Sequence, residues 1–283
     1  RGVVARVFPT EHARLDALHQ GGRLPAGAEH LQGGAALRLL LALEDAAREL
    51  NRGFIKRMEQ GMPFVSVKMA SSLDGRSALK NGSSQWITSA AARRDVQFLR
   101  ARAAAILTSA QTVLDDDPSL NLRLSKQDLK QIFEVRQPVR VVLDSRLRLS
   151  GSEKLFTIPG DIWIYTLRED PDRRERLAAR GATVIQASGD AAGRIDLAAV
   201  LQDLAQREIN EVHSECGQRL AGALIDQNLA DQVVLNLAPH LLGSAARGIF
   251  DLGELTSMEQ RKTCSMRDVR QIGVDLRLTL SVD

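Results

Sequence analysis

Two patterns of apolar residues, one typical of strands and one typical of helices, alternate along most of this chain. From Pro63 onward, short apolar runs rich in β-branched residues predict strands, and apolar residues three and four positions apart predict helices. The strands are expected at Phe64–Ala70, Ala104–Thr108, Val139–Asp144, Asp161–Thr166, Ala182–Gln186, Glu211–Ser214, Gln232–Ala238 and Asp275–Val282. The clearest helices are expected at Ser89–Arg102, Asp196–Arg207 and Leu220–Asn228. This order indicates βαβ units, and hence an α/β fold with a mostly parallel central sheet flanked by helices.

Both ends of the chain depart from that pattern. Leu alternates with Arg and Thr over Leu276–Leu280, which predicts an edge position for the final strand. At the front, Val3–Phe8 reads as a strand, Thr10–Leu18 as a brief helix and Gln20–Gly34 as a connector, before a long helix over Ala35–Met58 that Gly61 and Pro63 end.

Composition narrows the class of protein. Hydrophobic residues make up 44% and charged residues 26% of the 283 residues, which is typical of a globular chain. The formal charge of +3 is too small for a nucleic-acid-binding stripe. Two cysteines, Cys216 and Cys264, are too few for a disulfide framework, so a reducing compartment, the cytoplasm, is expected. No apolar run is long enough to span a membrane, and no signal peptide opens the chain.

The densest polar segment runs from Lys68 to the helix that begins near Ser89. The turn Ser71–Gly75 follows a strand, where ligands bind in open α/β sheets, although an ordinary β-turn has the same composition. Trp86 precedes Thr88 and Ser89, either of which can cap the next helix. Free N–H groups beside an indole would suit a planar ring or a phosphate; the alternative is a core Trp that packs against the helix start.

Two further segments carry candidate chemistry. Arg93 and Arg100 share a helix face and could grip a phosphate, or could simply be solvated. The acidic run Asp115–Asp117 lacks the alternate spacing and interleaved Gly of a hard-cation loop, so recognition of a sugar hydroxyl is the better hypothesis.

A third segment, Glu211–Leu229, resembles a weak phosphate-binding turn. Gly217 makes a turn before a helix that begins at Gln218, and small residues including Gly222 would let backbone N–H groups approach a pyrophosphate. Glu215, at the end of the preceding strand, is the acid that a substrate would meet. The histidines have no metal-binding spacing and are interpreted as structural or solvated, and no metal site is expected.

Together these motifs resemble a known family. The segments FVSVKMASSLDGR, SSQWITSAAARRDVQFLRARAAAILTSAQTVLDDDPSLNLR, PVRVVLDS and ECGQRLAGALI, in this order, are similar to the reductase half of the bacterial bifunctional riboflavin-biosynthesis deaminase–reductases. The resemblance covers Leu50 to the C-terminus, including APHLLGSAARG. It implies a dihydrofolate-reductase-like α/β fold with an antiparallel C-terminal edge. It also implies NADPH-dependent reduction of 5-amino-6-(5-phosphoribosylamino)uracil to the ribitylamino product.

The resemblance also implies site residues. NADPH would be held by Ala70, Trp86, Thr112, Asp116, Ser145 and the turn of Gly217, Gln218, Arg219, Leu220, Ala221, Gly222 and Ala223. The phosphoribosyl substrate would be held by Ser84, Arg100, Leu120, Arg123 and Glu215. Lys68 matches a site lysine of the family, and we hypothesise that Lys68, Asp116 and Glu215 polarise the sugar or relay the proton. Arg100 and Arg123 would grip the substrate phosphate, and Ser145 with Arg146 would suit the 2′-phosphate of NADP.

The front of the chain departs from the family. Its members carry a zinc deaminase domain there, and no P-C-x-x-C motif occurs in this sequence. Because the chain starts at Arg1, that domain either lies upstream of a fragment or has been lost. We therefore expect residues 1–60 to be a residual domain end with a connecting helix and 61–283 to be the reductase. Deaminase activity is not expected; one equivalent of bound zinc would contradict this.

The resemblance favours a homodimer and a small-molecule substrate, with no nucleic-acid or membrane partner. One alternative is a reductase of the same fold that acts on a pterin or another nucleotide-derived substrate. A second is a reductase-like partner without catalysis.

Overall fold

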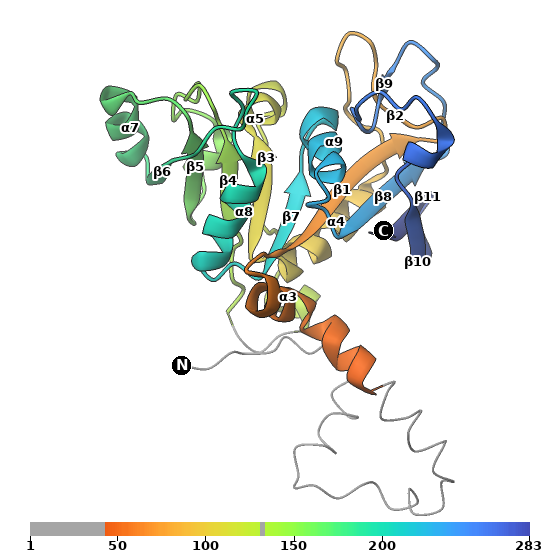
Figure 1. Cartoon of the computed structure of the whole chain (residues 1–283). Helices are drawn as coiled ribbons and strands as arrows, with labels where there is room; N and C mark the ends of the chain where they lie inside the picture. The colour runs from red at the N-terminus through yellow and green to blue at the C-terminus, as the bar shows by residue number, and fades with distance from the viewer. Residues whose placement is uncertain (1–42, 131–133) are drawn as a thin grey trace, which may run out of the picture.

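A nine-stranded sheet forms the centre of the molecule (Figure 1) in the computed structural model, which describes residues 43–130 and 134–283. The strand order is β10-β11-β8-β1-β7-β3-β4-β5-β6. Strands β8 to β6 run parallel to one another, whereas β11 and β10 are antiparallel. Their bounds are β1 Phe64–Ser72, β3 Ala105–Ser109, β4 Val139–Leu143, β5 Ile162–Thr166, β6 Ala182–Gln186, β7 Glu211–Glu215, β8 Gln232–Ala238, β10 Cys264–Ile272 and β11 Asp275–Val282. The predicted α/β class, parallel sheet and antiparallel C-terminal edge are confirmed.

The prediction that Leu276–Leu280 lies at the sheet edge is wrong. This segment belongs to β11, which pairs with β8 on one side and β10 on the other, so β10 is the edge strand. The sequence of β10, CSMRDVRQI, gave no strand prediction because an edge strand that is exposed along nearly its whole length needs no apolar alternation.

Helices follow the parallel strands and begin at polar caps. The bounds are α4 Ala90–Arg102, α5 Ala110–Asp116, α6 Lys126–Leu129, η2 Lys154–Thr157, α7 Pro171–Ala178, α8 Leu197–Gln206, α9 Gln218–Asp226 and η3 Met258–Gln260. Ser89, Ser109, Asp170 and Asp196 each accept a hydrogen bond from a backbone N–H of the first turn, which satisfies a donor that the helix itself cannot. The short helices α5, α6 and α7 were not predicted.

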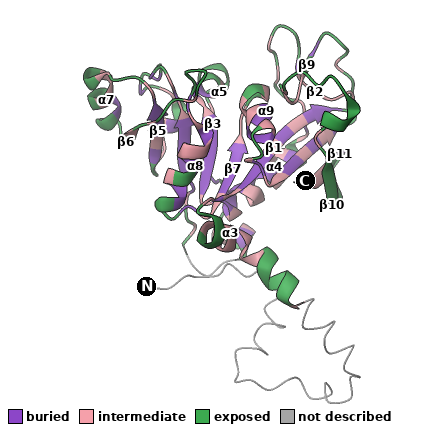
Figure 2. Cartoon of the chain, viewed as in Figure 1, coloured by how far each residue is buried: buried purple, intermediate pink, exposed green. Residues whose placement is uncertain are grey.

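Two apolar layers cover the two faces of the sheet. One layer joins Val65, Val67 and Met69 of β1 to apolar residues of α8 and α9. The other joins β4 and β5 to α5 and α7, and α4 lies on this second face in Figure 1. Because side chains alternate along a strand, Lys68 of β1 and His213 and Glu215 of β7 point to the second face, beneath α4. Figure 2 shows the buried residues concentrated in the strands.

The front helix is interrupted and docks at the amino ends of the strands. Residues 43–50 are helical, Asn51 is a turn, and α3 spans Arg52–Gln60. The predicted helix Ala35–Met58 is therefore not continuous, although its predicted end at Gly61 is confirmed. A Cβ on Gly53 would lie 2.6 Å from the Asn210 carbonyl oxygen, so glycine permits this close approach. The elements predicted for Val3–Phe8, Thr10–Leu18 and Gln20–Gly34 lie outside the described residues.

A small second sheet closes one end of the strands. Strand β2 (Arg76–Ala78) pairs with β9 (Arg247–Gly248). Asp74 in the preceding turn accepts hydrogen bonds from Ser72 Oγ and from the N–H groups of Leu242 and Gly243. These bonds lower the pKa of Asp74 to about 2, with Ser72 the largest contributor. The predicted turn at Ser71–Gly75 is thus an anchor between two distant loops.

Candidate functional site

The predicted site residues gather at the carboxyl ends of parallel strands. Along the chain β1 leads to β3, but β7 lies between them in the sheet. Ligands of open α/β sheets bind at such topological switch points. Lys68 and Glu215 are direct neighbours across β1 and β7 at this edge.

A buried ion pair dominates the centre of this edge. Arg100, on α4, donates from Nε to Glu215 Oε1 at 2.6 Å and from Nη2 to Glu215 Oε2 at 2.8 Å. Its Nη1 donates to the Asn121 carbonyl at 2.7 Å. Arg100 is only 7% exposed. The bidentate geometry fixes the Glu215 carboxylate, since a planar guanidinium fork matches both carboxylate oxygens.

The pKa values of this cluster shift in different directions. Burial alone would raise the pKa of Glu215, but the charge and hydrogen bonds of Arg100 hold it well below its usual range. Burial lowers the pKa of Lys68, with Arg100 adding to the fall and Glu215 opposing it. Glu215 is therefore a fixed negative charge, whereas Lys68 gives up its proton more readily than an exposed lysine does.

His213 also faces this cluster and was missed in the sequence. It is 2% exposed, and its Nε2 lies 3.5 Å from Glu215 Oε1. His213 precedes Glu215 by two positions on one strand, and this period-two spacing is the signal that could have placed both on one face.

Unpaired buried polar atoms line the same face of the sheet. Within the described residues, Thr108 Oγ1, Asp144 Oδ1 and both amide atoms of Asn236 have no hydrogen-bond partner. These side chains stand at or near the carboxyl ends of β3, β4 and β8. Buried polar groups are nearly always hydrogen-bonded in native proteins, so these atoms fit a polar ligand at this edge. Asn236, which pairs in register with Ala70, carried no sequence signal.

The three adjacent acids do not form one site. Asp115 accepts from Gln111 Nε2 at 2.8 Å, and Asp117 accepts from the Lys154 N–H at 2.7 Å. Asp116 is near Gln85, and its pKa is raised by burial and by the charge of Asp115. Each carboxylate thus has a different neighbour. Within the described part of the chain, no group of three or more His, Cys, Asp or Glu side chains is arranged to hold a metal ion.

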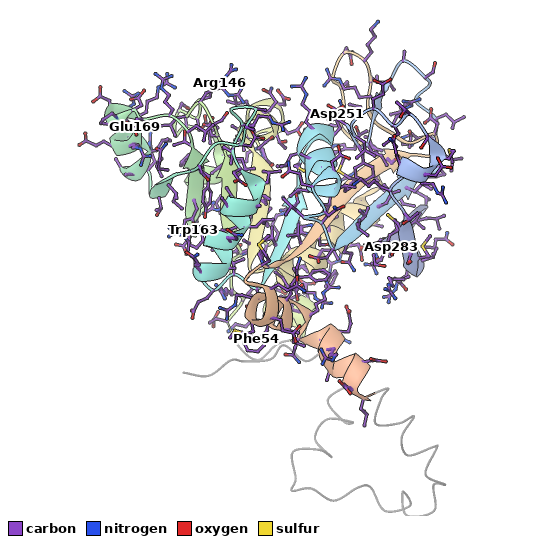
Figure 3. The ribbon with its side chains drawn as sticks, in the orientation of Figure 1. Phe54, Arg146, Trp163, Glu169, Asp251 and Asp283 are labelled. Carbon is purple, nitrogen blue, oxygen red and sulfur yellow. The ribbon has the colours of Figure 1, made fainter. Side chains whose placement is uncertain are left out.

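The turn after β7 differs from the expected arrangement. Gly217 is the N-cap of α9 and makes no side-chain cap, and a Cβ there would meet nothing within 4 Å. No side chain of the described residues therefore caps the N-terminus of α9, and its binding of a phosphate stays a prediction. Gly222, however, is buried, and a Cβ on it would lie 2.1 Å from the Asp251 carbonyl oxygen. The lack of a side chain at Gly222 admits the Asp251 backbone, which lies beside α9 in Figure 3, and the predicted cofactor contact of Gly222 stays a prediction.

The other members of that turn have mixed exposure. Ala221 is buried, Arg219 is exposed, and Gln218, Leu220 and Ala223 are partly buried. Gln218 accepts the Asp251 N–H through its carbonyl at 3.1 Å. Only the first residues of the predicted turn can present backbone to a ligand.

The α4 N-terminus is closed to a phosphate. Asp275, 1% exposed, accepts from the N–H of Ser89 at 2.8 Å and from its Oγ at 2.6 Å. Trp86 is 69% exposed, so it is not the core residue of the alternative interpretation. Its ring lies 4.4 Å from the Arg93 guanidinium, which holds it as a flat, open surface.

The two predicted arginine pairs stand differently in the structure. Arg93 stacks on Trp86 and donates to the Thr88 carbonyl at 2.7 Å, whereas Arg100 binds Glu215, so Arg93 and Arg100 do not form one grip. Arg123 is exposed. The predicted role of Arg100 and Arg123 in phosphate binding stays a prediction.

The remaining predicted residues differ in burial and in position. Thr112 is in the first turn of α5, and its N–H donates to Ser109 Oγ at 3.3 Å. Leu120 is buried, Ser84 and Ser145 are partly buried, and Arg146 is exposed at the edge shown in Figure 3. Ser145 lies two residues after Leu143, where β4 ends, which places it at the edge expected for a ligand.

Comparison with known proteins gives consistent matches. The model of a protein family described as "RibD C-terminal domain" matches residues 63–278. The chain is 39% identical over 247 residues to the Riboflavin biosynthesis protein RibD of Haemophilus influenzae, covering 84% of this chain and 63% of that protein. It is 34% identical over 210 residues to a 5-amino-6-(5-phosphoribosylamino)uracil reductase of Buchnera aphidicola, covering 72% of this chain and 98% of the relative. The chain thus spans less than two thirds of the RibD relative and nearly all of the reductase.

Solved structures agree with these matches. The RibD structure of Acinetobacter baumannii superposes with a TM-score of 0.76 at 37% identity, over 85% of this chain and 64% of that one. The riboflavin biosynthesis reductase Rib7 of Saccharomyces cerevisiae superposes with a TM-score of 0.61 at 15% identity, which shows a shared fold. No helix among the described residues has the length and apolar character to cross a membrane.

Proposed function

The chain belongs to the family of RibD C-terminal domains, and from that membership we propose that it reduces 5-amino-6-(5-phosphoribosylamino)uracil to its ribitylamino product with NADPH. The observation that carries the proposal is the Lys68–Glu215–Arg100 cluster at the switch point of the sheet. It combines a lysine of lowered pKa with a carboxylate held ionised. The Buchnera reductase, whose length this chain covers almost entirely, supports the same reaction.

The residues present fit NADPH. The uncapped start of α9 at Gly217 offers backbone N–H groups for a phosphate. Thr112 and Ser145 would hold the dinucleotide at the ends of β3 and β4, and the exposed face of Trp86 would receive a flat ring. The unpaired Thr108 hydroxyl and Asn236 amide give further buried polar partners at that edge. When bound, NADPH supplies a hydride.

The chemistry needs one hydride and one proton. In the ring-opened substrate the sugar is joined to the uracil through an imine, C1′=N. Reduction forms a C–H bond at C1′ and an N–H bond at the nitrogen, and the C=N π bond is broken. We assign Lys68 as the donor of that proton, because burial lowers its pKa.

Glu215 has a different task. Arg100 keeps it ionised, so it would accept hydrogen bonds from sugar hydroxyls, and its charge favours the protonated form of Lys68. Asp116, whose pKa is raised, remains the second candidate for the proton relay. Arg100 uses three of the roughly five N–H donors of a guanidinium on Glu215 and Asn121, which leaves donors for the substrate phosphate beside Arg123.

The test is NADPH oxidation, followed by absorbance, with the deaminated phosphoribosylaminouracil beside its non-deaminated precursor. Lys68→Met is expected to lower kcat by about a hundredfold or more, the usual contribution of a general acid. Glu215→Gln is expected to lower kcat as well, because the carboxylate that orients the lysine is lost. Lys154→Met removes an exposed lysine on η2 as the control and should keep the full rate.

The outcomes separate the alternatives. Full activity of Lys68→Met would overturn the assignment of the proton donor. NADPH binding without oxidation would favour a non-catalytic reductase-like protein. Oxidation only with a pterin or another substrate that lacks phosphate would favour a different reductase of this fold.

The domain boundaries and the oligomeric state of the protein are also proposals. We propose that residues 61–283 form the reductase, with residues 1–60 as the connecting part. We also propose a homodimer, for which the exposed Met266 and Val269 on edge strand β10 offer an apolar surface. Sedimentation equilibrium measures this directly, and a monomer at micromolar concentration would contradict it.

A further inference from the structure

A small hollow lies outside the cluster described above, between the segment after β4 and helix α7. Arg148, Leu149 and Ser150 line one side, and Arg173, Arg176 and Leu177 line the other. Its volume is about 280 Å³. That is at the lower limit of pockets for drug-sized molecules, roughly 300 Å³, so it suits a small ligand.

The charged side chains that line this hollow are all positive. Three of its six lining side chains are guanidinium groups, and none is a carboxylate. Like charges that share one concave surface repel each other, and a bound anion removes that repulsion. Leu149 and Leu177, 3% and 1% exposed, form an apolar floor where a bound anion meets less water.

The arginines are only partly engaged. Arg173 donates from Nη1 to the Leu147 carbonyl at 2.6 Å, and its Nε lies 3.6 Å from Asp170 Oδ2. Arg148 donates from Nη1 to Gln111 Oε1 at 3.0 Å, and its Nε lies 3.9 Å from Asp144 Oδ1. Within residues 43–130 and 134–283, Arg176 has no hydrogen-bond or ion-pair partner. Arg148 and Arg173 are thus oriented by neighbours, and Arg176 is left to bind.

Nearby acids are used elsewhere. Glu153 accepts from the N–H groups of Ser150 and Gly151, at 2.8 and 2.9 Å, and so folds the loop. Asp144 accepts the Leu149 N–H at 2.9 Å, and Asp170 caps α7. These bonds fix both walls of the hollow, so Arg148 and Arg173 are held beside it before any ligand arrives, and helix α7 presents Arg176 to it.

From these contacts we propose that this hollow is a binding site for a phosphate group, gripped by Arg148, Arg173 and Arg176. The guanidinium fork matches phosphate oxygens bidentately, which favours phosphate over a halide or a single carboxylate. The phosphate can come from two sources, a free phosphate ion or the phosphate of a bound nucleotide. The proton transfer assigned to Lys68 uses none of these three arginines, so failure of the phosphate site would leave that assignment standing.

Inorganic phosphate, titrated calorimetrically into the full chain at low ionic strength, is the direct probe. We expect saturable binding, and Arg176→Gln should raise the Kd by about tenfold or more, since a charge-assisted contact is lost. Arg174→Gln is the matched control. It removes the same charge from the same helix, but Arg174 points to the Val184 carbonyl and Gln186 and does not line the hollow. The control should keep the Kd within about twofold.

A competition then identifies the source. NADP⁺ that displaces phosphate where NAD⁺ does not would assign the site to the 2′-phosphate of the dinucleotide. Phosphate binding that neither dinucleotide disturbs would assign it to a free phosphate; both results support the site. Absence of saturable binding, or an equal Kd for the wild type and Arg176→Gln, would overturn the proposal.

Discussion

Helices α4 and α9 both begin just beyond the site edge, yet their N-termini differ. At α4, the carboxylate of Asp275 comes from β11 and accepts both the N–H and the hydroxyl of Ser89. At α9, Gly217 provides no side chain, and the first N–H groups are left without a side-chain cap. The positive end of a helix attracts one anion. In α4 the protein supplies that anion itself, and in α9 the place stays free for a ligand.

The difference determines which of the two helix N-termini is accessible to an anionic ligand. The β10–β11 turn also covers α4, since a Cβ on Gly273 would lie 2.9 Å from the Ala91 Cβ. Nothing comparable lies over Gly217. The closed end anchors the antiparallel edge of the sheet to α4, and the open end is the one proposed to bind a phosphate.

The largest expected effect comes from opening α4. Asp275→Ala removes the acceptor of both the Ser89 N–H and the Ser89 hydroxyl proton in a partly buried place, which should reduce the free energy of unfolding by about 3 kcal/mol. Urea unfolding measures it. Asp275→Asn keeps one acceptor oxygen and should lose less. If Asp275→Ala were as stable as the wild type, the carboxylate would not be what closes α4.

A smaller effect is expected from closing α9. Gly217→Asp adds a capping carboxylate where a Cβ meets nothing, so stability should rise by a few tenths of a kcal/mol. The same charge should weaken NADP⁺ binding by about tenfold, because it occupies the anion place. Gly217→Ser, a cap without charge, is the control and should weaken binding less. Unchanged NADP⁺ affinity in a fluorescence titration of Gly217→Asp would mean that α9 does not hold the phosphate.

The effect expected at the α4 cap itself is smaller than that of Asp275→Ala and smaller than a tenfold change in NADP⁺ affinity. Ser89→Ala removes one hydroxyl but leaves Asp275 bound to the Ser89 N–H, so the loss should be about 1 kcal/mol. Thermal unfolding detects it as a lower Tm. The double variant with Asp275→Ala should lose less stability than the sum of the two single losses, since the two groups share a hydrogen bond. Full additivity would show that they do not act together.

The parallel sheet was predicted well because buried strands are rich in apolar and β-branched residues, which can be recognised in the sequence. β6, β8 and β11 have the predicted bounds, and the other predicted strands differ by one or two residues. Edge strand β10 was missed because it is exposed, and the edge role assigned to β11 failed for the same reason.

The site was predictable in its members but not in its contacts. Glu215 and Lys68 stand in recognisable segments, yet the ion pair of Arg100 with Glu215 joins residues 115 positions apart. Asp275 closes α4 from 186 positions away, and Asp251 fills the space above Gly222. Periodicity describes a residue's own element, and these contacts depend on how distant elements meet.

Helix α3 has a practical consequence for handling the protein. Lys56 pairs with Asp231 at 2.7 Å, and Arg52 pairs with Glu211 at 3.4 Å, so α3 is fastened at the amino ends of β7 and β8. Phe54, on α3, lies at the far end of the molecule from Arg146 in Figure 3. A tag or surface linker joined ahead of residue 43 therefore starts from the side away from the reactive edge, and immobilised protein should keep that edge turned toward the solution.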